Sequence, residues 1–259
     1  MALSSKFESI SCEVFIIGLT GYADAGGVVS YSTNYLARKL KCNRITIISG
    51  DSFLDYTINR PLVAISNGVA RAFQRINYHV LLSNDGRTLM IVGPEPNLKW
   101  KSFINMIFKL ANLSKAKLIC TLGGFIDNVG EPKVSYVIPS ESLKESLKID
   151  NLSPIEYRGP SSIYSLMVIK ARERNLQALS LWVHVPYINH VLLPQLGSID
   201  YWSSFELLST VNKVLNLNLD LKEAEEQCRK FKNRLEVARY IGEQGLPREV
   251  SEQPSKYIF

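Results

Sequence analysis

The sequence predicts an α/β fold of three layers, in which a mixed sheet lies between two layers of helices. Over the first 200 residues, short apolar runs alternate with segments of helical periodicity, which is typical of a sheet covered on both faces. Several of those runs are too apolar to alternate, so their strands are expected to be buried on both sides. A chain of 259 residues, 46% hydrophobic and 21% charged, is long enough for one large domain with an appendage or for two small ones.

Strands are expected wherever a short run is rich in β-branched and aromatic residues and is bounded by turn residues. Residues 60–74 contain two apolar stretches around the turn Asn67-Gly68, and such a pair is typical of a β-hairpin. A hairpin at this place would make the sheet mixed. The other expected strands cover residues 13–19, 45–49, 78–82, 88–92, 117–122, 134–138 and 178–184.

Helices are expected where apolar residues recur at helical spacing. The clearest begins at Asn97, which follows Pro94-Glu-Pro and is a favourable N-cap residue. Three more helices are expected over residues 28–40, 161–174 and 200–215. The apolar stripe of the helix that begins at Asn97 consists of Trp100, Phe103, Ile104, Ile107, Phe108 and Ala111.

The C-terminal part of the chain has a different pattern. Apolar residues recur there at alternating intervals of three and four, which makes a heptad seam, with charges at most positions between them. Such a helix either packs on its own domain or faces a partner. We therefore divide the chain into an α/β/α domain (1–219), an amphipathic helix (220–243) and a tail (244–259) whose Gly, Pro, Ser and Gln predict flexibility. The seam consists of Leu221, Ala224, Cys228, Phe231, Leu235 and Ala238.

Composition excludes several classes of protein. The formal charge is +6, but the basic residues are scattered rather than gathered in a stripe, so no nucleic-acid partner is expected. No apolar run approaches the roughly 18 residues that span a bilayer, and residues 1–11 lack the apolar core of a signal peptide. A cytoplasmic protein without membrane contact is therefore expected. The four cysteines have no zinc-site spacing and are expected to be free thiols, so neither a metal nor a cofactor is predicted.

A glycine-rich stretch, residues 18–27, follows the first predicted strand and opens a helix, which is where phosphate-binding loops lie. It lacks the G-x-G-x-x-G spacing of a dinucleotide site and the lysine of a P-loop. Nucleotide binding is therefore disfavoured. Asp24 within this stretch is a candidate helix N-cap first and a catalytic carboxylate second.

Two further turns are expected at the same edge of the sheet. In residues 93–100, two prolines fix the backbone around Glu95 and place its carboxylate at the carboxyl edge, where the constraint serves either packing or a ligand. In residues 121–124, two glycines allow close backbone approach. The three turns together could rim one crevice. Its candidate residues are Asp24, Glu95, Asn97 and Trp100.

The residues give no support to an enzyme. No serine stands in a G-x-S-x-G elbow, and the histidines do not form an H-E-x-x-H pattern. His184, within an apolar run, is expected to be a strand residue whose ring is satisfied by hydrogen bonds rather than a catalyst.

Several distinctive segments follow one another between residue 13 and residue 240. The most specific of them is Gly93-Pro-Glu-Pro-Asn-Leu-Lys-Trp100. The others are Gly21-Tyr-Ala-Asp-Ala-Gly26, Arg60-Pro61, Thr121-Leu-Gly-Gly124, Tyr157-Arg-Gly-Pro160, Leu181-Trp-Val-His-Val-Pro186 and Leu217-Asn-Leu-Asp-Leu221. In order and spacing, these segments resemble those of the proteasome assembly chaperone family, in its archaeal and bacterial branch.

This resemblance implies a non-enzymatic domain that is similar in fold to nucleoside phosphorylases and related hydrolases and that self-associates. It also implies binding to the proteasome core particle through a C-terminal tail of the form hydrophobic, tyrosine, any residue, which docks between α-subunits where its carboxylate meets a lysine. Here Tyr257 is third from the end instead of second, and Lys256 precedes it. The candidate partner-binding residues are Tyr257, Ile258 and Phe259.

Two hypotheses of function follow. The first is a cytoplasmic, self-associating binding protein that engages the proteasome core particle or its subunits through its surface and its tail. The second is a small-ligand protein, for a nucleoside-like ligand, or a hydrolase, which uses the crevice near Asp24 and Glu95.

Overall fold

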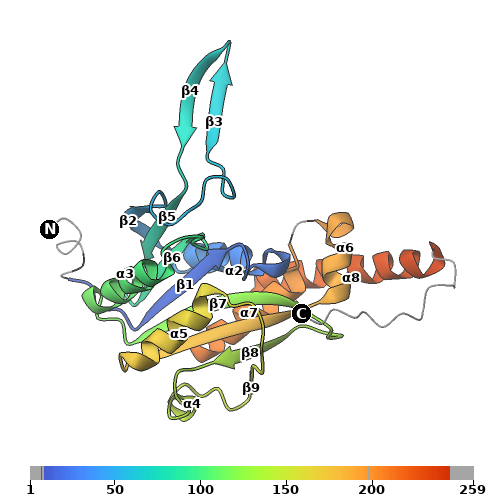
Figure 1. The fold of residues 1–259 in the computed structure, drawn as a ribbon. Coiled ribbons are helices and arrows are strands. Elements are labelled where there is room, and N and C mark those ends of the chain that lie inside the picture. Colours follow the sequence, from blue (N-terminus) through green and yellow to red (C-terminus); the bar gives the residue numbers. More distant parts are fainter. Residues whose placement is uncertain (1–6, 8, 198, 246–259) are drawn as a thin grey trace.

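The fold is that of a computed structural model, which describes residue 7, residues 9–197 and residues 199–245 (Figure 1). Its centre is an eight-stranded sheet. The strands lie in the order β2 (Asn43–Ser49), β5 (Asn77–Leu82), β6 (Thr88–Pro94), β1 (Val14–Thr20), β7 (Leu118–Asp127), β10 (Ala178–Pro186), β8 (Lys133–Val137) and β9 (Ser153–Pro154).

The sheet is mixed, as the sequence predicts. The four central strands β6, β1, β7 and β10 are parallel, whereas β5 and β8 run antiparallel to their neighbours in the centre. Every residue of β10 is buried, and so are the first six of β1. Strands with helices on both faces need this continuous apolar character.

Helices cover both faces of the sheet, which gives the three expected layers (Figure 1). Alternate residues of β1 face opposite sides: Phe15 and Ile17 belong to one apolar cluster, and Val14 and Ile16 belong to the other. The first cluster includes residues of α3 (Trp100–Leu113) and α5 (Ile163–Glu173). The second includes residues of α2 (Val28–Lys39) and α7 (Tyr201–Val214).

Helices α5 and α7 begin where the sequence predicts, whereas helix α3 does not. Ser162 caps α5 by accepting a hydrogen bond from the backbone N–H of Tyr164, and Asp200 caps α7 by accepting one from Ser203. The prediction that Asn97 caps the next helix is wrong. Helix α3 begins at Trp100, after a residue of left-handed backbone, because the Asn97 side chain is engaged elsewhere.

A two-stranded hairpin, β3 (Leu62–Ser66) and β4 (Val69–Gln74), confirms the turn predicted at Asn67-Gly68. Its strands pair only with each other, and the hairpin stands away from the rest of the molecule (Figure 1). The expectation that a hairpin here makes the main sheet mixed is therefore wrong, because that sheet is mixed through the antiparallel pairing of β5 with β6 and of β8 with β10.

The C-terminal helix α8 (Lys222–Gly245) packs on its own chain. Its residues Cys228, Phe231 and Leu235 are buried against α7 and against α6 (Tyr187–Leu196), a helix that the sequence analysis did not predict. Of the two alternatives for the heptad seam, packing in cis is the one observed. The remaining elements are η1 (Ala25–Gly27) and α4 (Leu143–Ser146).

Residues 246–259, which make up most of the predicted tail, lie outside the described residues. None of the helices in the described part of the chain has both the length and the apolar character that crossing a bilayer requires.

Candidate functional site

The carboxyl ends of the parallel strands meet at one edge of the sheet, where two of the predicted turns lie. The third prediction was wrong, because residues 121–124 continue strand β7, which ends only at Asp127. Gly124 still meets the glycine-rich stretch: it forms a bridge with Asp24, and its N–H donates to the carbonyl of Ala23 at 2.7 Å.

The Asp24 carboxylate caps the first turn of helix α2, the role predicted for it, although the residue at the N-cap position itself is Gly27. Its Oδ1 accepts hydrogen bonds from the backbone N–H groups of Val29, at 2.7 Å, and Ser30, at 3.1 Å. Its Oδ2 accepts one from the Ser30 hydroxyl. Burial raises the pKa of the Asp24 carboxyl, and the hydrogen bonds from Ser30 and Val29 offset part of that effect. The carboxylate therefore satisfies amides that the first turn of a helix leaves without partners.

Glu95 has a similar role at helix α5. Its Oε1 accepts a hydrogen bond from the backbone N–H of Ile163 at 2.7 Å, and its own N–H donates to the carbonyl of Thr20 at 2.7 Å. Burial raises the pKa of the Glu95 carboxyl, which the hydrogen bond from Ile163 partly offsets. A carboxylate in the first turn also interacts favourably with the helix dipole. These contacts hold the turn to both β1 and α5.

Asn97 holds the segment from which the hairpin rises, and Trp100 holds its own turn. The Asn97 Oδ1 accepts hydrogen bonds from the backbone of Asp55, at 3.1 Å, and from the side chain of Asn59, at 2.6 Å. The Trp100 indole donates to the carbonyl of Pro96 at 2.6 Å. The polar groups of the G-P-E-P-N-x-x-W segment are thus engaged in structural contacts.

Removal of the Glu95 carboxylate should cost stability. We expect Glu95→Ala to lower the free energy of unfolding by about 1–3 kcal/mol, because the N–H of Ile163 loses its acceptor. Glu95→Gln keeps an acceptor oxygen and should cost clearly less. Denaturant unfolding of both variants measures the difference. Equal stability of Glu95→Ala and the unaltered chain would show that the hydrogen bond contributes nothing.

An apolar pocket of about 480 Å³ lies beside these turns. It lies at the carboxyl edge, between the ends of β7 and β10 and the segment that precedes α5. The hydroxyls of Tyr22 and Tyr157 both donate to the carbonyl of Pro160, at 3.3 and 2.9 Å. None of the four predicted crevice residues lines it. The lining residues are Tyr22, Ala25, Phe125, Ile126, Val137, Ile155, Tyr157, Pro160, Ser162, Ser165 and Trp182.

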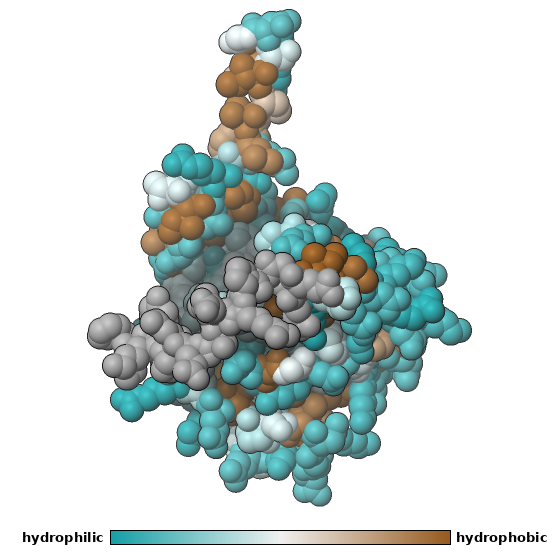
Figure 2. Space-filling view, turned by 90° about the vertical axis from the view of Figure 1, so that its right-hand side faces the viewer, coloured by the Kyte–Doolittle hydropathy of each residue, from teal (hydrophilic) through white to brown (hydrophobic). Residues whose placement is uncertain are grey.

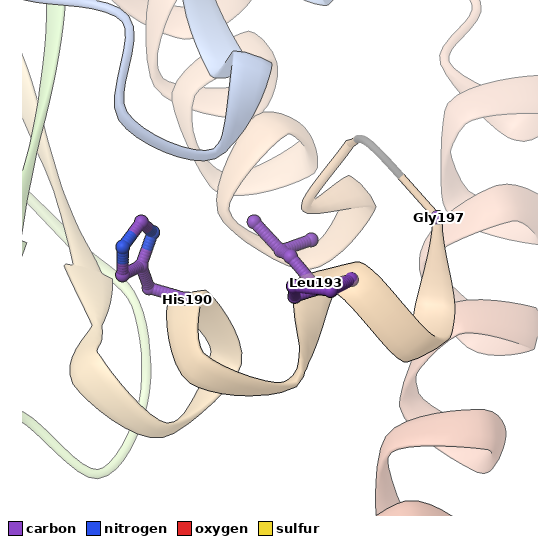
Figure 3. Close-up of a pocket in the computed structure, with 4 residues that line it drawn as sticks. His190, Leu193 and Gly197 are labelled. Atoms are coloured by element: carbon purple, nitrogen blue, oxygen red, sulfur yellow. The ribbon is translucent and has the colours of Figure 1, made fainter.

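A second pocket, of about 510 Å³, lies on helix α6 and is lined by His190, Leu193, Pro194 and Gly197 (Figure 3). In Figure 3 the side chains of His190 and Leu193 point to the same side of the helix. The lining is mostly apolar and contains one titratable side chain, that of His190. This composition suits an apolar contact better than an acid–base reaction.

A serine, a histidine and an aspartate form a hydrogen-bonded chain across three strands. The Nδ1 of His184 lies 2.7 Å from the Oδ2 of Asp127, and its Nε2 lies 2.8 Å from the Oγ of Ser135. The hydrogen bond from His184 lowers the pKa of the Asp127 carboxyl. Ser135 is only 2% exposed and the ring of Phe125 packs against His184, so the hydroxyl is closed to a substrate. The prediction that His184 is a hydrogen-bonded strand residue is confirmed.

Sequence reasoning missed the two partners of His184. Ser135 and Asp127 stand 49 and 57 residues away in the sequence, and only the neighbouring positions of β8, β10 and β7 bring them together. Among the described residues, no three or more His, Cys, Asp or Glu side chains are arranged to hold a metal ion.

The fold and the site together define a three-layer α/β/α protein whose sheet-edge carboxylates cap helices. The model of the PAC2 family matches residues 18–238, and the chain belongs to this family. The resemblance to proteasome assembly chaperones seen in the sequence is thereby confirmed.

Solved structures of similar fold come from bacteria and archaea. The proteasome-assembly chaperone homologue Rv2125 of Mycobacterium tuberculosis is 21% identical, with a TM-score of 0.74 over 92% of this chain and 97% of that chain. A PAC2 family protein of Streptomyces avermitilis is 21% identical, with a TM-score of 0.71 over 91% and 96%. Pyrococcus furiosus PbaB, an archaeal proteasome activator, is 20% identical, with a TM-score of 0.63 over 90% and 95%. No curated protein matches the chain.

Proposed function

We propose that the chain is a proteasome assembly chaperone-like protein that binds the proteasome core particle or its subunits and carries out no catalysis. Its membership of the PAC2 family is the observation on which this proposal rests. Two proteins of similar fold support it, since one is described as a proteasome-assembly chaperone homologue and the other as a proteasome activator.

The contacts of the carboxylates support a binding role over an enzymatic one. Asp24 and Glu95 each accept hydrogen bonds from the first turn of a helix, and a general acid or base must be free to exchange its proton with a substrate. The buried hydroxyl of Ser135 lacks the exposure that a nucleophile needs. Cytoplasmic location is part of the proposal, and the four free cysteines are consistent with a reducing compartment.

The C-terminal residues Tyr257, Ile258 and Phe259 are the proposed docking segment for the α-subunits of the core particle. They offer an aromatic side chain, an aliphatic side chain and a carboxylate, which together suit an apolar pocket with a cation at its end. Helix α8, which precedes the segment in the sequence, packs through Phe231 and Leu235 on the body of the protein.

Binding to purified core particles from the same organism tests this proposal. We expect the full chain to bind, and a chain that ends at residue 256 to bind at least about tenfold more weakly. Ile258→Tyr is the matched variant, because it places a tyrosine second from the end behind an aromatic residue, and it should bind more tightly than the unaltered chain. Absence of binding by the full chain contradicts the proposal. Unchanged binding after truncation would show that the contact lies outside residues 257–259.

A second candidate function is the binding of a small, nucleoside-like ligand in the pocket of about 480 Å³. Its volume falls in the range of ordinary ligand pockets, and its lining is aromatic with few polar groups. Because Trp182 lines it, a bound ligand should change tryptophan fluorescence and raise the melting temperature. Titration with nucleosides distinguishes the two functions, since the chaperone-like role predicts neither change.

A further inference from the structure

The hairpin β3–β4 exposes several large apolar side chains to solvent. Both strands are exposed along their whole length, with Leu62 at 67%, Ile65 at 64% and Phe73 at 59%. Figure 2 shows hydrophobic surface along a projection that stands clear of the body. Val63 lies directly opposite Phe73 across the two strands.

Such a hairpin is not stable in water by itself. Two strands without a third strand or a covering helix are marginal in water. A continuous apolar run, such as residues 62–65, is typical of a strand covered on both faces. Contiguous exposed apolar surface of this kind marks an interaction site in a natural protein. The hairpin therefore needs a covering surface that its own domain does not supply.

The positive charge of the hairpin argues against the hairpin of a second copy as the covering surface. Residues 57–75 contain Arg60, Arg71 and Arg75 and no acidic residue. Arg75 has a weak partner at the base, since its guanidinium lies 4.0 Å from the carboxylate of Asp51. Two hairpins side by side would bring two sets of arginines together without a counter-charge, and like charges on neighbouring strands are destabilising.

A surface of matching character lies at the same edge of the sheet. We call it the edge patch; it consists of the exposed side chains Tyr22, Ile126, Tyr157, Tyr187, Ile188 and Val191. The first three line the mouth of the pocket of about 480 Å³, and the last three belong to helix α6, which follows β10 directly.

The chemistry of the edge patch complements that of the hairpin. Its three tyrosines offer faces on which an arginine can stack, and its apolar pocket can receive Phe73 or Leu62. The charged residues that flank the patch in the sequence are three acids, Asp127, Glu131 and Glu156, and two cations, Lys133 and Arg158. The carboxylate of Asp127 is hydrogen-bonded to His184, so Glu131 and Glu156 are the acids without that engagement.

The positions of the two surfaces decide how they can meet. The hairpin is inserted after the carboxyl end of β2, an outer strand, whereas the edge patch lies at the ends of β7 and β10 on the far side of β1. Within one chain the hairpin points away from the body (Figure 1). A contact between them therefore joins two chains head to tail, and such contacts build closed rings when the rotation between copies closes.

We propose that the apolar hairpin of one copy docks on the edge patch of a second copy. The contact buries the exposed apolar residues of β3 and β4 against the tyrosines and helix α6 of its neighbour. Each copy gives its hairpin to one neighbour and receives the hairpin of another.

Light scattering and sedimentation of the full chain test the proposal. The unaltered chain should be oligomeric, whereas V63D/F73D (hairpin variant) and Y187D/V191D (patch variant) should each be monomeric, with a dissociation constant raised at least about a hundredfold. Ile169→Asp is the matched control, because Ile169 is a similarly exposed apolar residue on α5, outside both surfaces, and it should leave the oligomer intact.

Mixing the two variants gives the decisive result. The hairpin variant keeps its patch and the patch variant keeps its hairpin, so an equimolar mixture should form a dimer that neither forms alone and that cannot grow. This recovery also shows that both variants are folded. A monomeric full chain, an oligomeric hairpin variant or a mixture that stays monomeric overturns the proposal. The proposal is also overturned if a chain that lacks residues 246–259 no longer forms the oligomer, because that result would identify the tail as the occupant of the patch.

Discussion

Asp24→Ala should lower the free energy of unfolding by about 2–4 kcal/mol. The substitution leaves the backbone N–H groups of Val29 and Ser30 without their acceptor and removes the partner of the Ser30 hydroxyl. These groups are partly buried, so water replaces the lost hydrogen bonds incompletely. Denaturant unfolding at neutral pH measures the effect.

Asp24→Asn is the matched control, because its Oδ1 can still accept the backbone hydrogen bonds. It should cost less than about 1 kcal/mol at neutral pH. A folded-state pKa raised by burial means that the folded protein binds the proton first as the pH falls. The contribution of Asp24 to stability therefore decreases as the pH rises from the ordinary carboxyl range through that raised pKa. As the solution is acidified, the free energy of unfolding of the unaltered chain should rise relative to that of Asp24→Asn. A difference in favour of the unaltered chain that grows with rising pH would contradict this assignment.

Gly18→Ala should lower the free energy of unfolding by about 1–3 kcal/mol. Gly18 lies in β1 under helix α2, and a Cβ atom there would overlap the methyl group of Thr33. Thr33 cannot turn away freely, because its Oγ1 donates to the carbonyl of Val29 at 2.8 Å. The strand and the helix must therefore move apart.

Thr33→Ser provides the test of that cause. It removes the methyl group that the new Cβ would meet and keeps the hydroxyl that binds Val29. The double variant should recover most of the loss, with a coupling energy of about 1–2 kcal/mol in the double-mutant cycle. If the losses in free energy of unfolding of the two single variants simply add in the double variant, the overlap with the Thr33 methyl group is not the reason that Gly18 is needed.

The sequence pattern predicted the fold correctly where a structural feature depends on residues that are close together in the sequence. Asp24 was identified as a cap from its place before a helical pattern, and its carboxylate accepts hydrogen bonds from the first turn of α2. The end of β7 was predicted five residues early, because Gly123 and Gly124 were interpreted as a turn. They are glycines for a different reason: a Cβ at Gly123 would meet the Trp182 ring, and one at Gly124 would meet Val28.

Tertiary partners account for what the sequence could not predict. The acceptor role of Glu95 depends on Ile163, which is 68 residues away, and nothing local to either residue indicates the other. Helix α6 was missed because it follows a buried strand without a polar cap and contains Pro194, which normally disfavours a helix. The network around His184 is hidden in the same way, since it depends on strand order.

The capping carboxylates of the sheet edge have a thermodynamic consequence for association. Asp24 and Glu95 fix the beginnings of α2 and α5, so the backbone beside the edge patch is ordered before any partner arrives. A preorganised surface loses little conformational entropy when it is covered. The affinity for a partner at this edge is then determined by the contacts that form, because the patch does not have to fold when the partner binds.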